Sequence, residues 1–114
     1  MQIIERKQGQ TVLLDLSGRL EASSAPQFVA WLQKLPAGPT RLAVNLSGVT
    51  FIDSTGLSAL VQGMKRCRER SGEFVLFGLQ QPVRIIFELT RLDKAFNIFL
   101  NEQDAMDALA IEKP

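Results

Sequence analysis

Apolar residues near the start of the chain occur in two short runs that predict a β-hairpin. The runs cover residues 2–6 and 11–18, and the polar turn sequence KQGQ separates them. Short runs of branched apolar residues divided by a glycine-containing turn are typical of paired antiparallel strands. We expect Gly18 to end the second strand.

Residues 23–35 follow with helical periodicity. Ser24 is placed to cap this helix, and Gln27 stands three residues later, as in a capping box. Pro26 is compatible with the first turn, where its missing N–H would have no helical partner. The apolar positions that share one face are Phe28, Trp31, Leu32 and Leu35.

Residues 40–52 predict a strand that is covered on both faces, because the apolar run within it is interrupted only by Asn45. The sequence DSTG at 53–56 then opens a segment with helical spacing, which the residues at 71–72 end. The apolar stripe of this predicted helix consists of Leu57, Leu60, Val61, Met64 and Cys67.

The rest of the chain continues to alternate between strand and helix patterns. We expect a strand at 73–78, a helix at 81–92, a short edge strand at 95–100 and a last helix at 101–110, which Asn101 can cap. Such alternation after a hairpin predicts an α/β fold. Its sheet would be mixed but mostly parallel, with four to five strands covered by about four helices.

Length and composition are those of an ordinary globular protein. The chain has 114 residues, of which 46% are hydrophobic and 22% charged, and we expect a single domain over 1–114. The net charge of +1 gives no general attraction for nucleic acid. No apolar run is long enough for membrane insertion, and the first residues are too polar for a signal peptide. A single cysteine forms no internal disulfide, and we expect a cytoplasmic protein.

The chain contains no histidine, which limits the chemistry it can perform. Serine–histidine catalysis, cysteine–histidine pairs and most zinc sites are excluded. Ser54 would need a lysine as base to act as a nucleophile, and Cys67 lies on an apolar stripe, where a buried small hydrophobic residue is expected. We therefore expect no catalytic residues, no cofactor and no metal.

The segment Asp53-Ser54-Thr55-Gly56 carries polar groups where a strand passes into a helix. The first N–H groups of a helix have no helical partners, and the helix dipole makes that end positive. Ser54 either caps the helix, which the residues alone favour, or carries a phosphate of roughly −1.5 to −2 charges that the helix start tolerates. A partner with an acidic or apolar surface would not tolerate this charge, so one modification would end binding and leave the fold intact.

The stretch AVNLSGVTFIDSTGLSALV resembles the signature of the STAS domain, as found in bacterial anti-sigma factor antagonists. That pattern is an apolar strand, Asp or Asn, Leu, a short turn, and then Asp-Ser-Ser/Thr-Gly-Leu opening a helix. The segments LSGRLEASSAP and LFGLQQPVRIIFELTRLDKAFNIFLNEQDAMDAL are also similar to the family. The resemblance covers essentially the whole chain and implies the STAS fold.

The resemblance implies a function as an anti-sigma factor antagonist. In the family, the serine after the aspartate is phosphorylated by a partner kinase, which here implies Ser54, with Thr55 as the second choice. The kinase is also the anti-sigma factor and has an ATPase fold like that of histidine kinases. The unphosphorylated antagonist binds it, phosphorylation ends the binding, and a metal-dependent serine phosphatase restores it. The implied partner-binding residues are Glu21, Ser23, Asp53, Ser54, Thr55, Gly56 and Leu57.

Two positions depart from the family pattern: Glu21 replaces an aspartate, and Ser58 replaces a glycine found in many members. Alternatives stay open at two others. Asp53 either orients Ser54 and meets the kinase or caps the adjacent turn. Gly56 either permits the close approach of another backbone or meets a turn requirement. STAS domains also serve as subunits of stress-signalling scaffolds and as accessory parts of lipid or anion transporters, which is the alternative function.

Overall fold

The computed structural model describes residues 1–110, in which strands and helices alternate after an initial hairpin. This order agrees with the order expected from the hydrophobic pattern. The elements are β1 (Gln2–Gln8), β2 (Thr11–Leu20), α1 (Ala25–Gln33), β3 (Arg41–Ile52), α2 (Ser54–Glu69), β4 (Glu73–Phe77), α3 (Gln81–Leu89), the 3-10 helix η1 (Leu92–Lys94), β5 (Asn97–Phe99) and α4 (Glu102–Ala110).

The strands form one 5-stranded sheet in the order β1-β2-β3-β4-β5. β1 and β2 are antiparallel and pair up to Gln8 and Thr11, on either side of a tight turn in which Gly9 adopts a φ of +61°. Every other neighbouring pair in the sheet is parallel. The predicted mixed, mostly parallel sheet is therefore confirmed.

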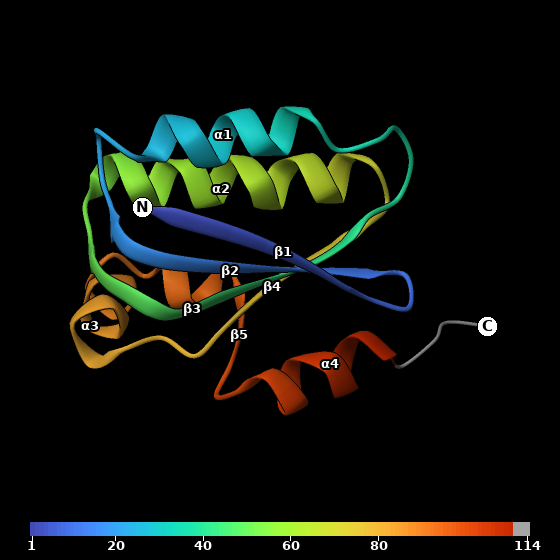
Figure 1. Cartoon of the computed structure of the whole chain (residues 1–114). Coiled ribbons are helices and arrows are strands. Elements are labelled where there is room, and N and C mark those ends of the chain that lie inside the picture. The colour runs from blue at the N-terminus through green and yellow to red at the C-terminus, as the bar shows by residue number, and fades with distance from the viewer. Residues whose placement is uncertain (111–114) are drawn as a thin grey trace.

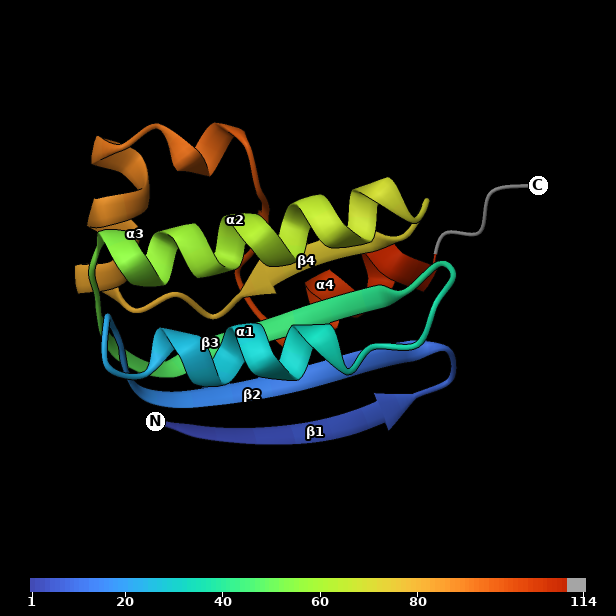
Figure 2. The same cartoon turned by 90° about the horizontal axis from the view of Figure 1, so that it is seen from above.

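Helices cover both faces of the sheet (Figure 1). α1 and α2 lie side by side over one face, α4 lies on the opposite face, and α3 lies beyond the carboxyl ends of β3 and β4 (Figure 2). Successive strand residues point to opposite faces. In β3, Val44 therefore joins the core under α1 and α2, whereas Ala43 joins the smaller core under α4. The dense apolar run in β3, interrupted only by Asn45, follows from this double coverage.

Several predicted boundaries differ from the observed ones. Gly18 does not end β2, because its φ of +103° lets the strand pass through an irregularity in its pairing with β3 and continue to Leu20. The helix expected over 81–92 ends at Leu89. Arg91 then takes a left-handed conformation with φ 64°, and the chain turns into η1. β5 is at the edge of the sheet, as predicted, but is shorter than expected.

Candidate functional site

The start of α2 lies at the sheet edge where β2 and β3 end. These two strands are parallel, and Leu20 pairs with Ile52, so the residues that follow each strand come together. Residues 21–24 and the first turn of α2 therefore form one surface, although they are far apart in the sequence. The carboxyl edge of parallel strands is a common place for binding sites.

Asp53 caps α2 and ties its start to the loop after β2. Its Oδ1 accepts a hydrogen bond of 2.8 Å from the Gly56 N–H, and its Oδ2 accepts one of 3.1 Å from the Ala22 N–H. The donation from Gly56 lowers the pKa of Asp53 below its ordinary value, and the Ala22 N–H adds to this effect. The capping alternative for Asp53 is thus what the structure shows, while its direct role toward a partner stays a prediction.

Ser54 is the first residue of α2 and its side chain is exposed. Because Asp53 supplies the cap, the capping role considered for Ser54 is not observed. Within residues 1–110 the Ser54 hydroxyl makes no hydrogen bond. Thr55 and Ser58, the other two hydroxyl residues in this part of the helix, are also exposed. The fold thus leaves the Ser54 hydroxyl facing solvent.

Gly56 allows the helix start to lie directly against the end of β2. A Cβ at this position would collide with the Leu20 carbonyl oxygen and lie 2.9 Å from Cγ1 of Ile52. The backbone that approaches Gly56 is therefore that of a neighbouring strand, one of the possibilities considered from the sequence. Gly56 and Leu57 are both buried, so they fix the position of the site from beneath.

The loop after β2 is held by its own hydrogen bonds. Glu21 forms an ion pair of 2.8 Å with Arg19, and Ser23 is exposed. The predicted side-chain cap of α1 by Ser24 is wrong, because the Ser24 hydroxyl makes no hydrogen bond to the start of that helix. This hydroxyl instead accepts a bond of 3.0 Å from the Glu21 N–H and donates to the Arg19 carbonyl. One reason is that Pro26, in the first turn of α1, offers no N–H to a cap.

Sequence reasoning missed two surface features beside this loop. Phe51 is 39% exposed, and the Arg19 guanidinium lies 4.1 Å from the centre of its ring. Strand alternation gave no signal for this, because the pairing of β2 with β3 is irregular there. A groove of about 390 Å³ also runs between α1 and α2, with an uncharged lining of Ala25, Pro26, Val29, Ala30, Gln33, Thr55, Ser58, Ala59 and Gln62.

In the part of the chain that the structure describes, no three or more Cys, Asp or Glu side chains are grouped so that they could hold a metal ion. Cys67 is buried, as predicted, and burial raises the pKa of its thiol to about 11. Among residues 1–110 there is also no helix with the length and apolar character needed to cross a membrane.

Comparison with protein families identifies the fold. Residues 2–105 match the family model of the STAS domain. The chain belongs to the STAS domain family. The resemblance noted in the sequence is therefore confirmed, and the DSTG segment with its exposed Ser54 lies inside the matched region.

Individual STAS relatives agree with this assignment. The chain is 34% identical over 99 residues to an anti-sigma-B factor antagonist of Listeria monocytogenes, which covers 83% of this chain and 86% of the relative. A STAS domain protein from Planctomyces limnophilus has a TM-score of 0.82 and 26% identity, covering 95% and 97% of the two chains. An anti-sigma factor antagonist from Thermotoga maritima, described as putative, has a TM-score of 0.85 and 25% identity, covering 94% and 93%. Antagonists of this kind are regulatory binding proteins and not enzymes.

Proposed function

We propose that this STAS protein is an anti-sigma factor antagonist that binds a serine kinase and is released by phosphorylation of Ser54. The kinase is itself the anti-sigma factor and has an ATPase fold like that of histidine kinases. The exposed Ser54 hydroxyl at the first position of α2 is the single observation that carries the proposal.

The hydrogen bonds around Ser54 support this role. The cap of α2 is made by Asp53 and the docking of α2 depends on Gly56, so neither function needs the Ser54 hydroxyl. Esterification of that hydroxyl would break no hydrogen bond among the described residues. A kinase could therefore modify Ser54 without unfolding the helix start.

Electrostatics support the loss of binding after phosphorylation. A phosphate adds roughly −1.5 to −2 charges next to Asp53, whose lowered pKa keeps it ionised at neutral pH. The positive end of the helix dipole offsets part of this repulsion inside the protein. A partner surface that fits the neutral hydroxyl closely would meet a concentrated negative charge, and losing such a fit can abolish binding.

The proposed contact surface consists of the exposed and half-buried residues around Ser54. Glu21 and Ser23 contribute from the loop after β2, and Asp53 and Thr55 from the helix start. Gly56 and Leu57 belong to the same site but are buried, so we assign them to its support. Thr55 is the second candidate for phosphorylation because it is also exposed.

The proposal also covers the removal of the phosphate and the compartment in which the exchange takes place. A metal-dependent serine phosphatase would remove the phosphate and restore binding. Because the kinase uses ATP, we propose that the exchange takes place in the cytoplasm.

The test uses the full chain, its kinase and ATP. Mass spectrometry should place the phosphate on Ser54, and Ser54→Ala should remove the signal, whereas Ser71→Ala, at an exposed serine beyond the other end of α2, should keep it. Calorimetry should show that the unphosphorylated protein binds the kinase and that Ser54→Asp does not.

Absence of phosphate on Ser54, or unaltered binding by Ser54→Asp, would refute the switch. A stable homo-assembly of many copies in native mass spectrometry, without phosphorylation, would favour the scaffold function. Stable co-purification with a transporter would favour the accessory role.

A further inference from the structure

The groove between α1 and α2 adjoins the surface around Ser54. The two helices lie side by side over one face of the sheet (Figure 1 and Figure 2), and the groove between them has a volume of about 390 Å³. Thr55 belongs to both regions, because it lines the groove and is also one of the exposed residues around Ser54. The groove therefore continues the proposed contact surface along α2.

The groove follows the length of the two helices. Its lining positions recur every three or four residues on each helix: Ala25, Val29 and Gln33 on α1, and Thr55, Ser58 and Gln62 on α2. Residues at this spacing lie on one side of a helix. A rise of about 1.5 Å per residue from Thr55 to Gln62 gives the groove a length of roughly 10 Å, which is about two helical turns.

The lining of the groove has the chemistry of an interface core. Among the described residues, no charged side chain lines it. Ala25 and Ala59 are buried beneath it, while Pro26 and Ala30 are exposed at its sides. The core of a protein–protein interface is depleted of charged residues, because a buried charge without a partner is costly. A protein can therefore cover this groove without burying a charge of this chain.

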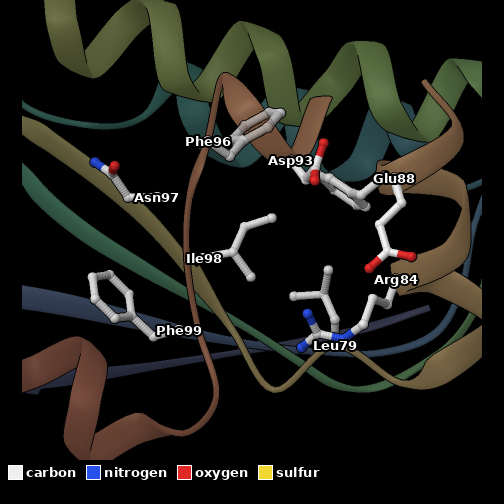
Figure 3. A pocket seen from close by; sticks show the side chains of 9 residues that line it. Leu79, Arg84, Glu88, Asp93, Phe96, Asn97, Ile98 and Phe99 are labelled. Carbon is white, nitrogen blue, oxygen red and sulfur yellow. The ribbon is translucent and has the colours of Figure 1, made fainter. Parts of the chain in front are cut away.

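The cavity between α3, η1 and β5 is different in both respects. Figure 3 shows Arg84 and Glu88 beside each other on its wall, and Asp93 also lines it. It shares no lining residue with the surface around Ser54. Of these two hollows, the groove is the one that combines an uncharged lining with a position next to Ser54.

The size of the Ser54 surface points to the kinase as the occupant of the groove. The exposed and half-buried members of that surface are Glu21, Ser23, Asp53, Ser54 and Thr55. A stable protein–protein interface involves about 20–30 residues on each side. A protein that binds over Ser54 must therefore cover neighbouring residues as well, and the groove begins at Thr55. The hollow between two adjacent helices accepts a third helix, and a helix lying in a groove is a common mode of recognition.

We propose that a helix of the kinase docks in the groove between α1 and α2 through an uncharged, largely apolar face. The proposal rests on the function proposed for Ser54 and extends it. Thr55 and Ser58 line the groove, whereas Ser54 does not. The docked helix would cover Thr55 and Ser58 and leave Ser54 beyond its end, so docking in the groove would select Ser54 among the three hydroxyl residues.

Charges of either sign placed in the groove test the proposal. Ala30→Arg and Ala30→Glu change an exposed residue of α1, and circular dichroism should show that both variants fold. In calorimetry with the kinase, each should bind at least about ten-fold more weakly than the wild type, because either charge would be buried against an uncharged face. Ala110→Arg, at an exposed alanine of α4 on the opposite face of the sheet, is the matched control and should bind normally. If the Ala30 variants do not fold, Gln62→Arg and Gln62→Glu on the other wall decide the matter.

The possible results distinguish this proposal from the function on which it rests. Normal binding by both charged variants, while Ser54→Asp does not bind, would overturn the groove proposal alone. Normal or tighter binding by one charged variant would show a charged occupant and overturn it too. Phosphate on Thr55 of the wild type, or self-association of the free protein that Ala30→Arg abolishes, would also overturn it, the latter in favour of a second copy. Absence of kinase binding by the wild type would refute the function proposed for Ser54 and the groove proposal with it.

Discussion

Replacing Gly56 with alanine should separate the start of α2 from the end of β2. The added Cβ would collide with the Leu20 carbonyl oxygen and lie 3.0 Å from the carbonyl carbon of that residue. These are backbone atoms of a paired strand, and the same oxygen accepts a hydrogen bond of 3.3 Å from the Asp53 N–H. The strand therefore has little freedom to yield, and the helix start must move.

The magnitude follows from two opposing effects. Alanine in place of glycine in a helix interior gains up to about 1 kcal/mol. Forcing an extra carbon into a packed site costs about 1–3 kcal/mol and sometimes more, and the cost is largest where the contacts are backbone. Because Leu20 leaves no room for relaxation, we expect a cost of about 3 kcal/mol, and after the gain of about 1 kcal/mol a net loss of about 2 kcal/mol in the free energy of unfolding.

Urea unfolding monitored by circular dichroism measures this change. Gly63→Ala in the same helix is the control, since a Cβ there meets the Phe74 side chain at 2.8 Å and not a strand backbone. The ring can tilt, so we expect a smaller loss of stability. A Gly56→Ala protein as stable as the wild type, or more stable, would show that helix propensity outweighs the contact and would refute the packing argument.

Three further predictions concern other contacts of the fold. The Gly56 N–H lowers the pKa of Asp53 in the folded protein. The ionised carboxylate therefore stabilises the fold above the unfolded-state pKa of about 3.9, and this stabilisation is lost as the pH falls through the lower folded-state pKa. An NMR titration should therefore give an inflection below about 3.9 for Asp53, and a value at or above it would contradict the cap. Arg6 bonds Glu102 of α4 at 2.8 Å, and since both side chains are about 40% exposed, Arg6→Met should cost about 1 kcal/mol in urea unfolding and less at high salt. Phe87→Ala should cost about 3–5 kcal/mol in the same assay, because the ring is fully buried, and a loss below 1 kcal/mol would contradict its place in the core.

The hydrophobic pattern predicted the elements of the fold well because its period changes sharply between them. The dense apolar run around Val44 and the wider spacing from Leu57 to Met64 have no common period, so strand and helix were distinguished. The same contrast located the candidate site, which lies where the two patterns meet. Boundaries were less predictable. Glycine often ends a strand, so Gly18 suggested an end, and only the pairing of β2 with β3 shows that the strand continues.

Individual hydrogen-bond roles were harder to predict than the position of the site. Ser24, Asp53 and Ser54 all have side chains suited to capping, and their order in the sequence does not rank them. The outcome depends on tertiary contacts, since Asp53 also receives the Ala22 N–H from a distant loop. The groove between α1 and α2 was not predicted for the same reason, because its lining residues belong to two helices that meet only after folding.

The arrangement at the helix start explains how one residue can change charge without a cost to the fold. Docking depends on Gly56 and capping on Asp53, two neighbours of Ser54 whose contacts face the protein. If Ser54 supplied the cap, a phosphate there would replace a hydrogen bond that the helix needs. Because Asp53 supplies it, and is ionised, the phosphate proposed for Ser54 would be repelled from the cap and directed toward solvent. That direction is where a partner must approach, so the same carboxylate that stabilises the helix would make the modification most disruptive to binding.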